Sequence, residues 1–206
     1  NLGGGNNIFT TNGDHVWVVN AFGGNDTLQF LGGQTDQAYA SSGNNTIRLN
    51  NGYHLGSLRV NEGNDTLIVA GGSDIQQALL GDGTNSASLT NSWIGSLRMG
   101  NGADTVTLSG SDIDTLNLGE GVNKLVLNPC SEIALVRGQG NETITLTGDA
   151  KIQALRLEGG VKVFTTDTRW TETYYAHEAV NTVTIGTGGI GQILITGSAF
   201  AQKISA

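Results

Sequence analysis

The 206-residue chain has 10 lysine and arginine residues against 18 aspartate and glutamate residues, and its net charge of −8 argues against a nucleic-acid-binding protein. It contains 32 glycines but one proline and one cysteine, which excludes an internal disulfide framework. No apolar run is long enough to span a membrane, so we expect no direct membrane insertion of this segment, and the 37% apolar content suffices for one sizeable core.

Glycines recur at intervals of 19 or 20 residues, and the residues between them align in columns: Gly5, Gly24, Gly43, Gly63, Gly83, Gly102, Gly121 and Gly140. Each interval contains two short apolar runs, for example Val106 and Leu108, followed by Ile113, Leu116 and Leu118. Alternation over a few residues is the strand period, and about 19 residues hold two or three short strands with turns. We therefore predict an all-β fold, a parallel β-solenoid of about ten coils of 19–20 residues.

The repeat covers almost the whole chain, so we treat residues 1–206 as a single β-solenoid domain. A longer repeat is superposed on the short one, because LGSLRV at 55–60 returns as IGSLRM at 94–99. Coils of two types therefore alternate. The chain begins at Asn1 rather than at methionine, and we expect it to be a fragment of a longer secreted protein.

The column pattern breaks at residues 165–180, which concentrate aromatic side chains. We predict a loop insertion here, an inserted aromatic loop near the C-terminal end of the solenoid. Trp170, Tyr174 and Tyr175 are its candidate ligand-binding residues, since aromatic rings stack on sugars. The alternative is that these rings only pack the loop against the coil.

Acidic and amide residues alternate two positions after each repeated glycine: Asn7, Asp26, Asn45, Asp65, Asn85, Asp104, Asn123 and Glu142. Asp26, Asp65 and Asp104 are candidate calcium ligands. Asparagine coils separate them, however, so the paired carboxylates that calcium requires are mostly missing. The alternative is that stacked asparagine and aspartate side chains bond the local backbone, and that alternation keeps like charges apart. We favour this alternative and expect no cofactor.

Arginine is concentrated in one outward column of the second strand of each coil, which contains Arg59, Leu79, Arg98, Asn117, Arg137 and Arg156. Four of the six arginines occupy this column. Guanidinium groups bind sulfate, phosphate and carboxylate groups, so Arg59, Arg98, Arg137 and Arg156 are candidate ligands for an anionic polysaccharide. The alternative is neutralisation by acids at the following corner, namely Glu62, Asp82, Glu120 and Glu158.

Catalytic arrangements are not evident. His15, His54 and His177 fall in different columns of our alignment, and Cys130 has no histidine near it in its coil. Asp112 and Asp114 are the carboxylates that a polysaccharide lyase or hydrolase of this fold would use, but no basic residue accompanies them. We therefore expect that the chain is not an enzyme.

The glycine- and asparagine-rich coils with stacked threonine turns resemble the passenger region of Gram-negative autotransporters, particularly the adhesin type. GNDTL at 24–28 and 63–67 is in addition similar to half of the RTX calcium-binding repeat. The first resemblance implies a secreted or bacterial outer-membrane-surface adhesin, a virulence factor that binds a host-cell glycan or surface protein or self-associates between cells. The second implies an RTX-like calcium-dependent structural module of a larger toxin or enzyme.

Overall fold

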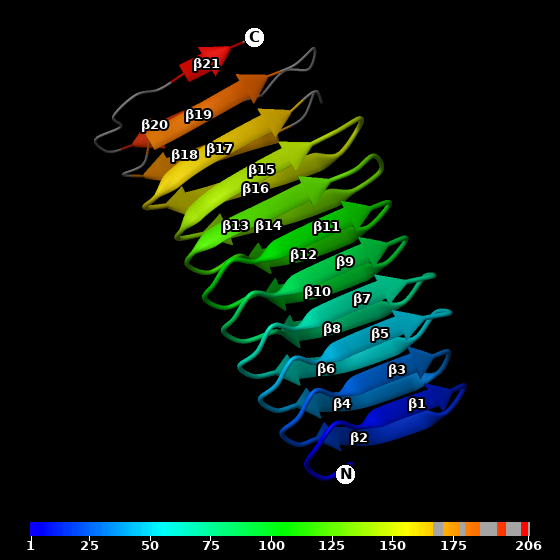
Figure 1. Cartoon of the computed structure of the whole chain (residues 1–206). Coiled ribbons are helices and arrows are strands. Elements are labelled where there is room, and N and C mark those ends of the chain that lie inside the picture. The colour runs from blue at the N-terminus through cyan, green and yellow to red at the C-terminus, as the bar shows by residue number, and fades with distance from the viewer. Residues whose placement is uncertain (167–170, 178–179, 186–192, 197–202, 206) are drawn as a thin grey trace.

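A computed structural model describes residues 1–166, 171–177, 180–185, 193–196 and 203–205. All regular structure in these residues is β-strand, stacked as successive coils (Figure 1). Strands in the first half of each coil are Ile8–Asn12 (β1), Thr27–Leu31 (β3), Thr46–Asn50 (β5), Thr66–Ala70 (β7), Ser86–Thr90 (β9), Thr105–Ser109 (β11), Val122–Leu127 (β13), Asn141–Leu146 (β15), Val161–Thr166 (β17), Val180–Ile185 (β19) and Lys203–Ser205 (β21). Strands in the second half are His15–Ala21 (β2), Gln34–Ala40 (β4), His54–Val60 (β6), Asp74–Leu79 (β8), Trp93–Arg98 (β10), Asp112–Asn117 (β12), Glu132–Gly138 (β14), Lys151–Glu158 (β16), Thr171–His177 (β18) and Ile193–Thr196 (β20).

Each coil contributes one strand to each of two parallel sheets. The odd-numbered strands form an 11-stranded sheet and the even-numbered strands a 10-stranded sheet, both in chain order. Every strand pairs in parallel with the equivalent strand of the next coil, for example Thr27 with Thr46 and Thr46 with Thr66. The predicted parallel β-solenoid is therefore confirmed, with two strands in each coil.

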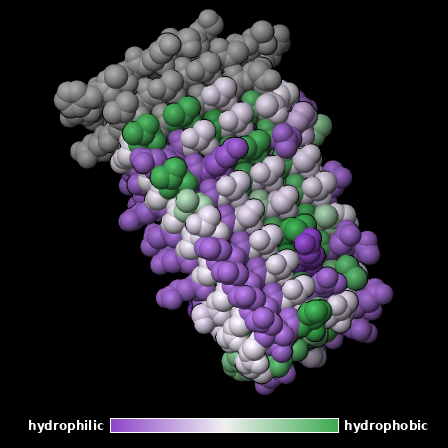
Figure 2. Space-filling model, viewed as in Figure 1, coloured by the Kyte–Doolittle hydropathy of each residue, from purple (hydrophilic) through white to green (hydrophobic). Residues whose placement is uncertain are grey.

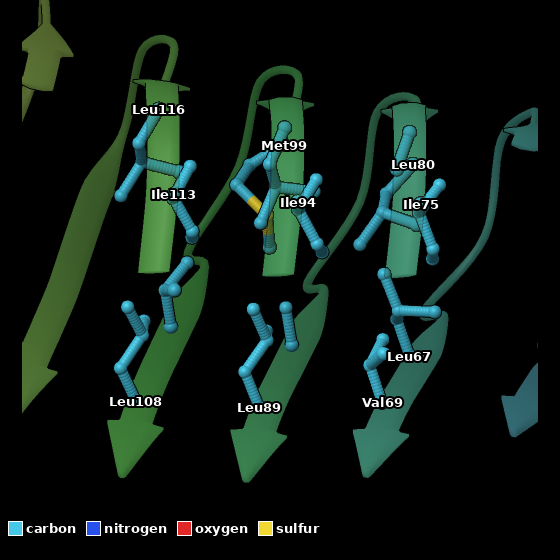
Figure 3. Close-up of a cluster of buried hydrophobic side chains, with 14 of the residues drawn as sticks. Leu67, Val69, Ile75, Leu80, Leu89, Ile94, Met99, Leu108, Ile113 and Leu116 are labelled. Atoms are coloured by element: carbon cyan, nitrogen blue, oxygen red, sulfur yellow. The ribbon is translucent and has the colours of Figure 1, made fainter. Parts of the chain in front are cut away.

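The core lies between the two sheets, where apolar side chains from both sheets face one another (Figure 3). Leu67 and Val69 of β7 point toward Ile75 and Leu80 in the second half of the same coil, and all four are fully buried. Adjacent coils repeat this arrangement, so one continuous apolar column runs along the solenoid. The core thereby buries the two apolar runs that the sequence repeats.

The even-numbered strands have a kink that places two successive side chains outside. In β8, Ile75 and Ala78 are buried, whereas Gln76 and Gln77 between them are exposed. In the register of β8 with β10, the pair Ile75↔Ile94 is followed directly by Gln77↔Ser96, so one residue on each strand is skipped. Strict alternation would bring one of these two side chains into the core. The kink therefore adds one outward-facing residue to each of these strands.

The coil count is close to the prediction. Strands β1 to β16 make eight coils that are described without a gap, and β17 to β21 continue both sheets. No helix long and apolar enough to cross a membrane occurs among the described residues.

The predicted loop insertion at 165–180 is wrong for the residues that the structure describes. Thr165 and Thr166 end β17, and residues 171–177 form β18, which pairs in parallel with β16 and β20. Tyr174 pairs with Leu155 in a column that is aliphatic in earlier coils, and the 19-residue interval between them is the ordinary repeat. Tyrosine and threonine favour strands, so their presence does not interrupt the solenoid.

Candidate ligand-binding face

The alternating asparagine and aspartate column lies inside the coil, at the corner that leads into each odd-numbered strand. Asp26, Asp65 and Asp104 are each 1% exposed, as are the asparagines between them. The backbone N–H of Asn45 donates to Asp65 Oδ1 at 2.7 Å, and the backbone N–H of Asp65 donates to Asn85 Oδ1 at 2.9 Å. We call this column the asparagine–aspartate ladder: Asn7, Asp26, Asn45, Asp65, Asn85, Asp104 and Asn123.

The ladder aspartates use one carboxylate oxygen each. Oδ1 accepts backbone N–H groups, whereas Oδ2 of Asp26, Asp65 and Asp104 is buried without a hydrogen-bond partner. Burial raises the pKa of Asp65 and of Asp104 to about 6, although hydrogen bonds from Asn45 and Asn85, respectively, act to lower it. A buried carboxylate with one unsatisfied oxygen favours its protonated form.

The ladder does not bring two of the candidate calcium ligands together. Asp26, Asp65 and Asp104 lie two coils apart, which is roughly 10 Å at the spacing of parallel strands. Calcium contacts its oxygen ligands at about 2.4 Å, so one ion cannot bridge two of these carboxylates. No group of three or more metal-ligating side chains is close enough to hold a metal among the described residues. The geometry favours the backbone-bonding alternative.

The four candidate arginines lie on the outer face of the even-numbered sheet. Register places them in one column, with Leu79 between Arg59 and Arg98 and Asn117 between Arg98 and Arg137. Arg137 and Arg156 are direct neighbours, and all four arginines are exposed. We call this set the arginine row: Arg59, Arg98, Arg137 and Arg156.

The arginine row does not pair with three of the corner acids in the described part of the chain. No ion pair or hydrogen bond joins its guanidinium groups to Glu62, Asp82 or Glu120, and the ion pairs among described residues are His15 with Asp36 and His54 with Asp74.

A hollow of about 660 Å³ adjoins the row at the corner that follows the even-numbered strands. Arg98 lines it together with Glu62, Asp82, Asn61 and Asn101. The Asp82 carboxylate accepts the backbone N–H of Asn101 at 2.9 Å, which holds that side chain in place. The hollow thus offers one guanidinium beside amide and carboxylate groups.

The outer face of the odd-numbered sheet differs in chemistry. Its first outward column consists largely of threonine and serine, as in Thr46, Thr66, Ser86 and Thr105, and Arg48 is exposed in the second. In Figure 2 the middle of the face turned to the viewer is largely pale with some hydrophobic residues, and hydrophilic residues line both of its edges. Arginine is therefore concentrated on the even-numbered sheet, although Lys124 is exposed on the odd-numbered one.

Trp93 is a surface residue that the sequence analysis missed. Trp93 is the first residue of β10, and its indole lies over Gly95. A Cβ atom at Gly95 would lie 3.0 Å from the indole ring, so the absence of a side chain there leaves room for the ring. The indole N–H donates to Asp114 Oδ1 of the next coil at 3.1 Å. The signal that could have found it is the 39-residue repeat, since His54 and Trp93 stand 39 residues apart, as do Arg59 and Arg98.

The histidine expectation is partly wrong. His15 and His54 share one column, because both pair with Gln34. His15 Nε2 lies 3.0 Å from Asp36 Oδ1, and His54 Nδ1 lies 2.5 Å from Asp74 Oδ2. A 19-residue step followed by a 20-residue step hid this alignment.

Three of the remaining candidates belong to the C-terminal part of the chain. Trp170 falls outside the described residues. Tyr175 pairs with Arg156, so β18 places it in the column of the arginine row, whereas Tyr174 stands in the Leu155 column. Asp112 and Asp114 are the residues considered for a lyase. Asp112 accepts the backbone N–H of Glu132 at 3.2 Å, and Asp114 accepts the indole N–H of Trp93 at 3.1 Å.

Searches of protein-family models, of curated proteins and of solved structures find no match to this chain.

Proposed function

We propose that this chain is a binding module of a secreted or surface-exposed bacterial adhesin, and that the arginine row binds an anionic glycan. The observation that carries the proposal is a column of four exposed guanidinium groups without intramolecular partners in the described residues. In a chain of net charge −8 such a column is a local feature and not a consequence of overall basicity.

Spacing along the rod supports a polymeric ligand. Arg59, Arg98 and Arg137 recur every second coil, roughly 10 Å apart at the strand spacing. Individual arginine–anion contacts at an exposed surface are weak, but contacts to one polymer add up. The resemblance to autotransporter passengers agrees with this role and with host-cell glycans, surface proteins or a neighbouring cell as partners.

The proposal does not involve catalysis. Asp112 and Asp114 serve as hydrogen-bond acceptors within the sheet, and no described lysine or arginine pairs with them. The RTX-like alternative receives less support, since backbone N–H groups already occupy Oδ1 of Asp26, Asp65 and Asp104.

Retention on sulfated-glycan beads across a salt gradient, in the presence of a chelator, tests the proposal. We expect the native chain to bind and the Arg98→Ala/Arg137→Ala double variant to bind roughly tenfold more weakly, equivalent to about 1.4 kcal/mol. Arg48→Ala is the matched control, because Arg48 is also exposed but lies on the opposite sheet. Failure of the native chain to bind, or equal losses for control and double variant, would overturn the proposal.

A further inference from the structure

Strand β10 combines an aromatic ring and a guanidinium on one outer face. Trp93 and Arg98 stand at its two ends, and Gly95 and Ser96 between them project little beyond the sheet. The indole lies over Gly95 and not over its own position, which brings the ring toward Arg98. Gly95, under the ring, precedes Arg98 by three positions along the strand, a distance of roughly 10 Å. An arginine side chain spans much of this distance.

The indole is held in one orientation. Its N–H is bonded to Asp114 in the next coil, and its ring edge packs on the backbone of Gly95. A ring already fixed in place loses little conformational entropy when a ligand binds. A partly exposed, fixed indole offers a flat apolar surface that the C–H face of a pyranose can cover.

The register neighbours at the two ends of β10 differ in charge, although Glu62 and Asp82 line the hollow beside Arg98. Asp74 and Asp112 are the register neighbours of Trp93, and Asp114 contacts its indole. Leu79 and Asn117 are the neighbours of Arg98. Carboxylates beside the indole accept hydroxyl donors and repel anions, whereas Arg98 attracts an anion. A matching ligand has an uncharged hydroxyl edge and an anionic edge.

We propose that Trp93, Gly95, Ser96 and Arg98 form a subsite for a uronic acid residue, with the sugar ring on the indole, its carboxylate at Arg98 and its hydroxyl edge toward Asp112 and Asp114. This inference rests on the proposed function and specifies the sugar class. A polyphosphate or nucleic acid lacks the neutral hydroxyl edge and would place phosphates beside three carboxylates. The repeat carries the same outward pattern in β6, where His54, Gly56, Ser57 and Arg59 take the equivalent positions.

Binding of an oligogalacturonate, measured by isothermal titration calorimetry, tests the subsite. We expect Trp93→Ala to weaken binding roughly tenfold and Trp93→Phe to weaken it less, because phenylalanine keeps a ring but loses the bond to Asp114. Trp17→Ala is the matched control, since Trp17 belongs to the same sheet and is 70% exposed. Circular dichroism verifies that each variant is folded.

Two results are decisive. Unchanged oligogalacturonate affinity in folded Trp93→Ala, or an equal loss in Trp17→Ala, overturns the subsite while the arginine-dependent retention on sulfated beads stands. Absence of binding by the native chain to both the oligogalacturonate and the sulfated beads overturns the proposed function and the subsite together.

Discussion

In the asparagine–aspartate ladder, the side chains from Asp26 to Asn123 lie inside the coil and hydrogen-bond the backbone of a neighbouring coil. In the arginine row, every side chain lies outside, and its guanidinium has no partner in the described part of the chain. Both are columns with one position per coil. The side of the sheet that each column occupies therefore decides whether its polar groups hold the coils together or remain available to a ligand.

The comparison separates stability from binding. Substitutions of the corner glycines are expected to destabilise the fold, because the backbones of adjacent coils touch there. Substitutions in the arginine row are expected to leave stability unchanged, because those side chains contact little. Three predictions test this separation, from the largest expected effect to the smallest.

Gly102→Ala should have the largest effect. Gly102 has a φ of +143°, and a Cβ atom there would overlap the carbonyl oxygen of Gly83 in the preceding coil. Backbone strain and this overlap together should lower the free energy of unfolding by more than about 3 kcal/mol. The midpoint of urea unfolding, followed by circular dichroism, measures the loss.

Two control variants sharpen this test. Gly52 has a φ of +70°, but no atom lies within 4 Å of the position that a Cβ atom would take, so Gly52→Ala carries strain without overlap and should lose about 1–2 kcal/mol. Arg98→Ala should change stability by less than about 0.5 kcal/mol. Equal losses at Gly102 and Gly52 would contradict the stacking argument, and a large loss at Arg98 would contradict the separation of the two columns.

The solenoid and its columns were predictable from the glycine interval. Any parallel coil must align residues one repeat apart, so the arginine row followed directly from spacing, and the structure confirms its register. The position of the ladder inside the coil was not recognised. Extending the alternation of the buried Leu28 and Phe30 back by two residues places Asp26 on the inner side, but its polar side chain next to a corner favoured a position in the turn.

Two features near the site were missed because the alignment followed aliphatic residues. β18 has threonine and tyrosine where earlier coils have isoleucine and leucine, so its strand character was overlooked. Trp93 occupies the column of His15 and His54, which share no obvious chemistry with tryptophan. What they have in common is a ring nitrogen bonded to an aspartate of the next coil, and this appears only in the folded chain.

Asp65→Asn/Asp104→Asn should stabilise the protein above pH 6. The pKa of both aspartates rises from 3.8 in the unfolded chain to about 6 in the fold, so the folded state binds protons more tightly. Their contribution to stability is therefore greatest below about pH 4 and is lost as the pH rises through 6. Asparagine fits this position, because Asn45 and Asn85 donate Nδ2 to backbone carbonyls in equivalent coils.

A pKa shift of about two units sets an upper limit of about 3 kcal/mol per aspartate, and we expect the net gain of the double variant to stay below the loss in Gly102→Ala. Thermal unfolding at pH 4.5 and pH 7.5 should show a stabilised double variant at pH 7.5 and a smaller difference at pH 4.5. Asp82 also raises the pKa of Asp104, so Asp82→Asn is a useful third variant and should reduce the shift at Asp104 alone. A double variant less stable than the native chain at pH 7.5 would show that the ladder requires its charges.

Millimolar calcium should have the smallest effect, a change in melting temperature below about 1 °C relative to a chelator. A specific site filled at a hundred times its Kd would add about 2.7 kcal/mol and would be readily visible. The ladder offers no such site, since each of Asp26, Asp65 and Asp104 already accepts a backbone N–H and lies two coils from the next carboxylate in the ladder. If calcium raised the melting temperature by several degrees and Asp65→Asn/Asp104→Asn abolished that rise, the ladder would be a metal site, and the RTX-like alternative would replace the structural one.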